Sequence, residues 1–157
     1  MTQVTERSIA YDTFVIERDF AVTPARAFHA FADQTAKADW FGGPTTSEVQ
    51  FDFRVGGQEI MSGAEPHTPA DDFRFVATYH DIVDNERIIY SYEMYAGGKK
   101  LSVSQTTITF EPTDEGTHLT FTEYGAYLDG LEPIGLRETG SIELMDSLGE
   151  YLANLAS

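Results

Sequence analysis

Glu123 is the acidic residue of this sequence with the pattern best suited to chemistry. It alternates with Leu119 and Phe121 along a stretch of strand periodicity, so all three side chains are expected to face inward. Burial disfavours an ionised carboxyl group and raises its pKa, which would let Glu123 donate or accept a proton. A neutral or ion-paired carboxyl without a catalytic role fits the same pattern, and Arg54 and Arg137 are its candidate partners.

The four histidines lack the spacing of a metal site. His29, His67, His80 and His118 are far apart, and no HxH pair, HExxH motif or carboxylate-rich loop accompanies them. We therefore expect no metal and no cofactor. His29 and His118 are expected to be solvated and His80 to be a structural strand residue. His67 lies in the polar, Pro-containing stretch 64–72, and we expect it at the rim of a ligand site.

Nucleophilic catalysis has no recognisable motif in the sequence. The chain has no cysteine, which excludes thiol chemistry, and it has no GxSxG motif or ordered set of Ser, His and Asp. Glycine pairs at 42–43, 56–57 and 97–98 lack the patterns of phosphate-binding loops and indicate turns. The sequence thus predicts no catalytic residue and favours a protein that is not an enzyme.

Charge and hydropathy limit the partners of the protein. The 157 residues include 26 acidic and 10 basic side chains, for a net charge of −16. Such a surface repels nucleic acid and anionic membranes, and both solubility and a saline habitat would explain it. No apolar run approaches the roughly 18 residues of a membrane span, and the polar start of the chain does not resemble a signal peptide. We expect a cytoplasmic protein that binds neither nucleic acid nor membrane.

The elements that position these residues follow from periodicity. We expect a flexible tail over residues 1–13 and a single domain over residues 14–157. Thr23 and Pro24 are typical of a helix start, and the apolar period changes from helical to alternating after Pro44. Short links between strands predict an antiparallel meander. Three helices are predicted: one that begins at Pro24, one over 34–40 and one over 136–154. The predicted strands span 14–22, 46–53, 57–63, 73–83, 87–95, 100–112 and 116–124.

The closing helix is amphipathic and is expected to lie on the sheet with its apolar stripe. Glu138, Glu143, Asp146 and Glu150 occupy the polar side of this helix. The stripe consists of Leu144, Leu148, Tyr151 and Leu155, and it is widened by Ile142, Met145 and Leu152.

Several segments match a known family in their order and spacing. They are TPARAFHAF, ADWFGGP, FDFRVGGQEIMSG, FVATYHDIVDNERIIYSYEM, TFTEYGAYL and MDSLGEYL. Through them the sequence resembles the START-like (Bet v 1-like) superfamily, most closely the bacterial SRPBCC branch similar to the Hsp90 ATPase activator homologue domain. The matching segments run from about Phe14 to Leu155. An extra Gly43 before Pro44, and Ser141 where the family often carries Trp, depart from the pattern.

The resemblance implies an α+β helix-grip fold. A curved antiparallel sheet of about seven strands would wrap around a long C-terminal helix, with two short helices after the first strand. It also implies a cavity between helix and sheet that holds a small hydrophobic, amphipathic or aromatic molecule, in a monomer or homodimer. Two alternatives stay open, a polyketide cyclase or hydrolase-like enzyme on the same fold and a co-chaperone-like partner of Hsp90.

Apolar and aromatic side chains that face the closing helix are the candidate lining of this cavity. A close-packed core would use the same residues, so both interpretations stay open. On the strand 73–83, Tyr79 and Ile82 fall on opposite faces unless a bulge intervenes. The candidate pocket residues are Trp40, Phe53, Met61, Phe75, Tyr90, Tyr92, Met94, Ile108, Phe110, Phe121, Glu123, Met145 and Leu148, with His67 at the rim.

Overall fold

The computed structural model describes residues 6–41, 46–64 and 72–156 of the chain. Within them, a first strand leads into two short helices, further strands and a long closing helix, which is the order predicted from the sequence. The elements are β1 (Ile9–Phe20), α1 (Pro24–Ala32), α2 (Gln34–Trp40), β2 (Thr46–Phe51), β3 (Gln58–Ala64), β4 (Asp72–Val83), β5 (Arg87–Ala96), β6 (Lys99–Thr113), β7 (Gly116–Leu128) and α3 (Leu136–Ala156).

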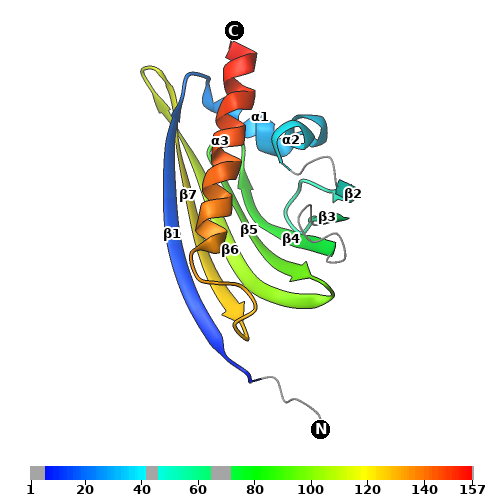
Figure 1. Ribbon diagram of the computed structural model, residues 1–157. Coiled ribbons are helices and arrows are strands. Elements are labelled where there is room, and N and C mark those ends of the chain that lie inside the picture. Colours follow the sequence, from blue (N-terminus) through cyan, green and yellow to red (C-terminus); the bar gives the residue numbers. More distant parts are fainter. Residues whose placement is uncertain (1–5, 42–45, 65–71, 157) are drawn as a thin grey trace.

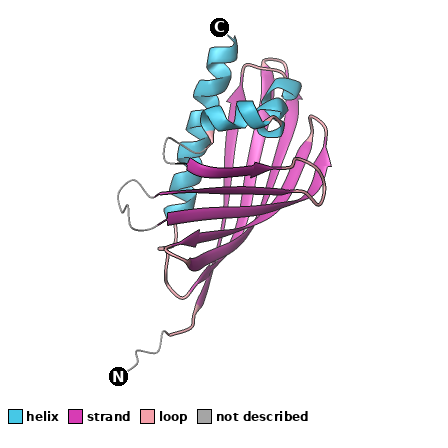
Figure 2. Cartoon of the chain, turned by 90° about the vertical axis from the view of Figure 1, so that its right-hand side faces the viewer, coloured by secondary structure: helices cyan, strands magenta, loops and turns pink. Residues whose placement is uncertain are grey.

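The strands of the described residues form one antiparallel sheet in the order β1-β7-β6-β5-β4-β3-β2. Strands β2 to β7 form the predicted meander, and β1 pairs with β7 along its whole length. Figure 1 shows the sheet curving around α3, with α1 and α2 beside the C-terminal part of that helix. The helices lie on one side of the sheet in Figure 2. The α+β helix-grip fold is confirmed.

β1 begins earlier than the sequence predicted. Residues 9–13, which were expected in the flexible tail, pair with the end of β7, and the Asp129 backbone N–H donates to the Ser8 carbonyl at 2.8 Å. Ile9 and Tyr11 both face outward and are exposed, so this part of the strand lacks the apolar inner residues that would have marked it. Residues 1–5 of the expected tail lie outside the described residues.

The two short helices begin where the sequence predicted. The Thr23 hydroxyl accepts a hydrogen bond from the Arg26 backbone N–H at 3.3 Å, and Pro24 occupies the first helical position. The Asp33 carboxylate accepts a bond from the Ala36 N–H at 2.9 Å and begins α2 in the same way. Both caps satisfy backbone donors that a helix start leaves without an intrahelical partner.

A register shift in β4 resolves the unclear phase of that strand. The pairing of β4 with β5 shifts between Tyr79 and Asp81, which is the bulge that the sequence required. Tyr79 is consequently buried at 2% exposure, and Ile82 also packs against the core. At the other end of the sheet, β2 stops at Phe51, so Phe53 lies after the strand and not in it.

The inner face of α3 packs closely against the concave side of the sheet. Met145, Leu148 and Leu152 are buried at 0–1% exposure and belong to the main core, and Leu144 and Tyr151 pack beside them. Two residues of the predicted stripe, Ile142 and Leu155, are exposed instead. Successive helix residues are rotated by about 100°, so Ile142 is turned away from the buried Ser141, and Leu155 lies in the last turn. No helix in the described part of the chain is long and apolar enough to span a membrane.

The burial of Leu148 gives a stability prediction for the closing helix. Leu148→Ala removes a fully buried side chain and leaves a cavity, and we expect it to cost about 2–5 kcal/mol of unfolding free energy. Glu150→Ala, on the exposed side of α3, should stay within about 0.5 kcal/mol of the wild type. Urea denaturation midpoints measure both. Equal midpoints would show that α3 does not hold the sheet.

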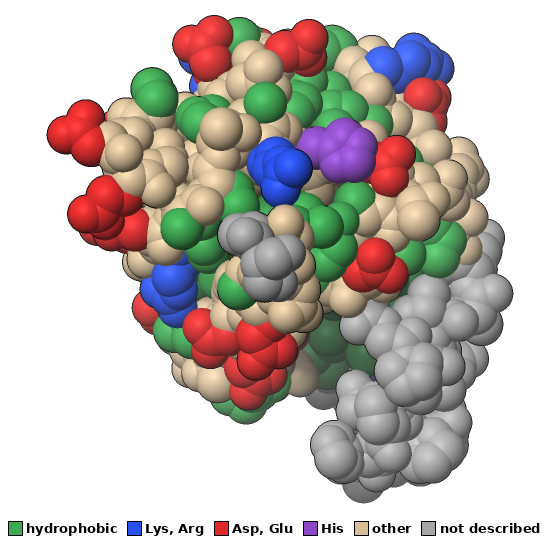
Figure 3. Space-filling model, turned by 90° about the horizontal axis from the view of Figure 1, so that it is seen from above, with side chains coloured by type: hydrophobic (Ala, Val, Ile, Leu, Met, Phe, Trp, Pro, Cys, Tyr) green, Lys and Arg blue, Asp and Glu red, His purple; other side chains and the backbone are tan. Residues whose placement is uncertain are grey.

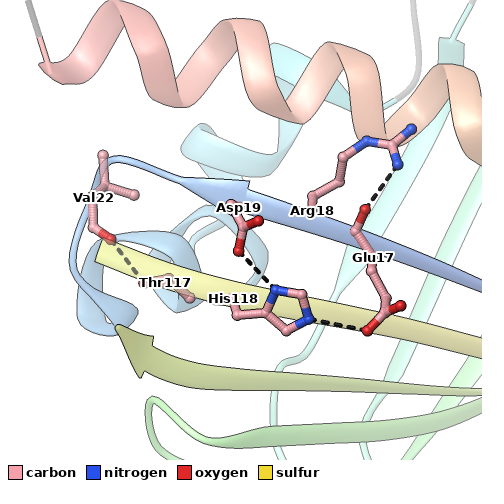
Figure 4. A network of polar contacts seen from close by, with 6 residues as sticks. All are labelled: Glu17, Arg18, Asp19, Val22, Thr117 and His118. Atoms are coloured by element: carbon pink, nitrogen blue, oxygen red, sulfur yellow. Dashed lines mark hydrogen bonds and ion pairs between the residues drawn. The ribbon is translucent and has the colours of Figure 1, made fainter. Parts of the chain in front are cut away.

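A polar network joins β1 and β7 on the outer side of the sheet (Figure 4). The ring nitrogens of His118 lie 2.7 Å from an Asp19 oxygen and 3.1 Å from a Glu17 oxygen. The sequence predicted a solvated His118, but its ring is bonded to two acidic side chains. The hydrogen bonds to Asp19 and then Glu17 raise the pKa of His118 above its ordinary value. Beside it, the Thr117 hydroxyl donates to the Val22 carbonyl at 2.7 Å, and Arg18 donates to the Glu17 carbonyl at 2.9 Å.

His118 should make stability depend on pH near neutrality. Its folded-state pKa is raised, so its stabilisation is fully present below the unfolded pKa of about 6.5 and is lost as the pH rises through the folded pKa. His118→Gln should therefore lower the melting temperature at acidic pH and change it little at alkaline pH. The double variant Glu17→Gln/Asp19→Asn should flatten the same profile. Parallel wild-type and His118→Gln profiles would contradict the assignment.

Candidate functional site

The inner faces of β6 and β7 change from apolar to polar along their length. Toward α1, Phe110 packs edge-on against Phe28 and Phe31, with ring centroids 5.6 Å apart in each pair. Toward the start of α3, hydroxyl and carboxyl groups replace the apolar side chains at the same inward positions. These buried polar residues are Ser102, Ser104, Thr106, Glu123 and Tyr127.

Glu123 lies in the middle of this polar region and is fully enclosed. Its side chain is 1% exposed, as the alternation with Leu119 and Phe121 predicted. One carboxylate oxygen accepts a hydrogen bond from the Tyr92 hydroxyl at 2.8 Å and the other from the Thr106 hydroxyl at 2.9 Å. Desolvation raises the pKa of Glu123 above its ordinary value, although these two donors oppose the shift.

Arg137 links the polar region to the first turn of α3. Its guanidinium donates to the Tyr92 hydroxyl at 2.8 Å, to the Ser102 hydroxyl at 2.9 Å and to a Glu132 carboxylate oxygen at 2.8 Å. The guanidinium carbon also lies 5.4 Å from the ring centroid of Tyr127. The Tyr92 oxygen thus accepts from Arg137 and donates to Glu123, and a continuous chain of hydrogen bonds joins the two charged groups. Of the two proposed partners of Glu123, Arg137 is near it, whereas Arg54 pairs with Asp52 at 2.8 Å on the surface.

Three buried oxygens in this region have no hydrogen-bond partner among the described residues. They are the Ser104 hydroxyl, the Tyr127 hydroxyl and the second carboxylate oxygen of Glu132. An unpaired buried polar group costs roughly 1–3 kcal/mol, so such atoms are uncommon and call for an explanation. Together with the residues that Glu123 and Arg137 bond to, these residues form what we call the Arg137 cluster. Its members are Tyr92, Ser102, Ser104, Thr106, Glu123, Tyr127, Glu132 and Arg137.

Gly125 sets the position of the Tyr127 ring. A Cβ atom at position 125 would lie 2.7–2.9 Å from the ring and hydroxyl of Tyr127, closer than real contacts allow. Only glycine therefore lets the ring fold back along β7 and bring its hydroxyl into the cluster. Burial raises the pKa of Tyr127 to about 12, so the hydroxyl stays protonated and can donate a hydrogen bond at neutral pH.

Most candidate pocket residues lie in the core, in two groups. Ile108, Phe110 and Phe121 of the sheet and Met145 and Leu148 of α3 are buried in the core between the sheet and the helices. Phe75, Tyr90, Tyr92 and Met94 form an aromatic region on β4 and β5, where the ring centroids of Phe75 and Tyr92 are 4.9 Å apart. This second group adjoins Glu123 through Tyr92. Burial alone does not separate a pocket wall from ordinary core, so the pocket assignment stays a prediction.

The remaining candidates lie further from the Arg137 cluster. The Trp40 indole donates to the Ala30 carbonyl at 2.9 Å and packs on Phe31, which holds α1 against α2. Phe53 packs edge-on against Tyr79 with centroids 4.9 Å apart. Met61 lines a separate cavity beneath α2. His67, expected at the rim, lies outside the described residues.

Several residues of the cluster were missed from the sequence. Ser102, Ser104 and Tyr127 occupy inward positions because the alternation of β6 and β7 continues past the apolar residues that were used to recognise it. Extending the period from Phe121 and Glu123 would have reached Tyr127. Glu132 lies in the loop before α3, where no periodicity points to it. No described group of three or more His, Asp or Glu side chains could hold a metal ion.

The family model described as Activator of Hsp90 ATPase homolog 1-like protein matches residues 21–153. Among solved structures, an uncharacterized protein of Rhizobium leguminosarum is 38% identical, with a TM-score of 0.90 over 96% of this chain and 99% of that one. Protein Mll3558 of Rhizobium loti is also 38% identical, with a TM-score of 0.84 over 92% and 99% of the two chains.

A more distant structure has the same fold. Protein CV1439 of Chromobacterium violaceum is 25% identical, with a TM-score of 0.73 over 88% of this chain and 95% of that one. No curated protein matches the sequence. These bacterial proteins therefore share the fold of this chain over 88–96% of its length.

The unpaired oxygens give a stability prediction that separates two kinds of hydroxyl in the cluster. Thr106→Val removes a donor from the buried Glu123 carboxylate and should cost about 1–3 kcal/mol. Ser104→Ala removes a hydroxyl without a protein partner, so the unfolding free energy of this variant should equal that of the wild type or exceed it by up to about 3 kcal/mol. Urea denaturation of both variants measures the difference. An equal loss in the two would show that Ser104 is bonded as firmly as Thr106.

Proposed function

The chain belongs to the family of Activator of Hsp90 ATPase homolog 1-like proteins, and on that premise we propose that it binds a small, neutral, amphipathic molecule between the sheet and α3. The fold of this family supports a ligand-binding or co-chaperone-like domain in general terms. The ligand would lie with its polar group at the Arg137 cluster and its apolar part against the aromatic side chains of β4 and β5.

The unpaired oxygens of the Arg137 cluster are the observation that carries this proposal. Ser104, Tyr127 and Glu132 offer two hydroxyls and one carboxylate oxygen, each buried and without a partner among the described residues. A purely structural core would be more stable with apolar side chains at these positions. A ligand that hydrogen-bonds to these atoms would offset the cost of burying them.

The charges of the cluster favour a neutral ligand. The guanidinium of Arg137 is already paired with Glu132, and Glu123 adds a second carboxyl group nearby. A ligand carboxylate would meet two acidic groups and only one basic group, so repulsion and desolvation would both oppose it. Figure 3 shows the opposite end of the molecule, where α3 terminates, and the acidic side chains spread over it illustrate the charge of the whole surface and not that of the cluster. The net charge of −16 acts in the same direction at longer range.

The apolar part of the ligand would contact an aromatic surface. The rings of Phe75, Tyr90 and Tyr92 lie on adjacent strands, with centroids 4.9–6.4 Å apart, and Met94 packs partly exposed beside them. Such rings bury a large apolar area, while the two tyrosine hydroxyls keep a polar edge. This combination suits a molecule that has both an apolar body and a hydrogen-bonding group.

The geometry supports binding better than catalysis. Both oxygens of Glu123 are occupied by Tyr92 and Thr106, so the carboxyl is held in place and not directed at a reacting atom. Glu123 is therefore not available to the enzyme alternative as a free acid or base. The co-chaperone alternative rests on the family description, and no contact among the described residues identifies a surface for Hsp90.

Two fluorescent probes that differ by one charged group test the proposal. N-phenyl-1-naphthylamine is neutral, and 8-anilino-1-naphthalenesulfonate adds a sulfonate to nearly the same skeleton. We expect the neutral probe to bind at least about tenfold more tightly. The double variant Ser104→Ala/Tyr127→Phe should weaken the neutral probe several-fold while the fold stays intact, because it removes two of the unpaired hydroxyls. Fluorescence titration measures each dissociation constant.

Gln105→Ala is the matched control, because Gln105 follows Ser104 on β6 but faces outward and is exposed. Its affinity for the neutral probe should equal that of the wild type. Tighter binding of the sulfonate, or equal loss in the control and the double variant, would contradict the proposed site.

A further inference from the structure

A buried ion pair lies on the opposite part of the sheet from the Arg137 cluster. The Lys37 ammonium of α2 donates to a Glu59 oxygen of β3 at 2.6 Å, and both side chains are at most 8% exposed. The Tyr79 hydroxyl donates to the same oxygen at 2.5 Å. Lys37 also lies 4.6 Å from the ring centroid of Phe41 and 5.7 Å from that of Phe51. The pair is therefore enclosed by aromatic side chains.

The ion pair forms part of the wall of a cavity of about 140 Å³. Besides Lys37 and Glu59, the cavity is lined mostly by apolar side chains of α2, β2 and β3. They are Ala38, Phe41, Val49, Phe51 and Met61, with Gln34 at the side. Its volume is close to that of the engineered cavity of about 150 Å³ that binds benzene. A single aromatic ring is therefore the size of molecule that the cavity accommodates.

We propose that this cavity is a second binding site, which takes a neutral single-ring aromatic molecule carrying a hydrogen-bonding oxygen, of the phenol class. The ring would lie among Phe41, Phe51 and Met61, and its oxygen would accept a hydrogen bond from Lys37. The site differs from the Arg137 cluster, because its residues come from α2, β2 and β3, whereas those of the cluster come from β5, β6, β7, the following loop and the start of α3.

The chemistry of the wall selects this ligand class. A buried ion pair adds little net stability compared with apolar residues of similar volume, so stability does not account for its presence beside a cavity. An ammonium carries three donors, and a ligand oxygen can accept one of them. Glu59 already neutralises Lys37 and would repel a second carboxylate at the same place. An oxygen-free ring would bring no acceptor to the ammonium.

The methionine methyl groups report on the two sites separately. Met61 lines this cavity, whereas Met145 is buried on the inner face of α3. In the intact protein with labelled methionine methyls, phenol should shift the Met61 signal saturably and leave the Met145 signal in place. Toluene and benzoate should each bind at least roughly fivefold more weakly than phenol. Trp40, the only tryptophan, has its ring centroid 5.6 Å from Phe41 and gives a second readout by fluorescence.

Two variants test the assignment. Ala38→Leu adds volume at an exposed helix position that lines the cavity, and it should weaken phenol by roughly tenfold without unfolding α2. Lys37→Met/Glu59→Met replaces the pair by apolar side chains and should abolish the preference for phenol over toluene. If that double variant does not fold, the test rests on Ala38→Leu and on the wild-type affinities for phenol, toluene and benzoate.

Some outcomes would overturn the second site. These are the absence of a saturable shift at Met61, equal affinity for phenol and toluene in the wild type, tighter binding of benzoate, or unchanged affinity in Ala38→Leu. None of them bears on the neutral probe at the Arg137 cluster, so failure of one site leaves the other open to its own test.

Discussion

A guanidinium held away from water needs partners for its donors, and Arg137 meets this need by joining segments that are distant in the sequence. It bonds to β5 through Tyr92, to β6 through Ser102 and to the preceding loop through Glu132. The first turn of α3 is thereby fixed over the polar end of the sheet. Loss of any one partner would leave a buried charge or donor unsatisfied, which is far more costly than the net value of the bond.

The position of α3 then determines what the rest of the sheet can do. Farther along the helix, the apolar side chains of Met145, Leu148 and Leu152 are packed at close to zero exposure. The polar end differs, because Gly125 and the small side chains of Ser102 and Ser104 replace bulky apolar groups. One helix thus covers a closed core at one end and a hydrogen-bonding region at the other, and this difference arises from the residues of β6 and β7.

Much of the fold, and one residue at the centre of the site, could be predicted from the sequence. Periodicity indicated the helices and the meander, and it placed Glu123 inside because an alternating strand has only two faces. The contacts that define the site were less accessible. Nothing in the local pattern shows that Arg137 and not Arg54 is linked to Glu123 through Tyr92, since that depends on how α3 crosses the sheet. The Lys37–Glu59 pair likewise forms only when α2 packs on β3, 22 residues away in sequence.

Both polar centres combine a buried cation with an acidic group, and this has a common consequence for recognition. Arg137 is paired with Glu132 and Lys37 with Glu59, so neither cation is left to attract an anion. The surface potential of a strongly acidic protein lowers the local concentration of anions before they reach either site. Hydrogen-bonding donors and acceptors remain, in surroundings of aromatic rings where such bonds are stronger than in water. Selectivity at both sites would then come from hydrogen bonds that match the ligand within apolar surroundings. The negative charge of the protein would contribute only by disfavouring anionic ligands.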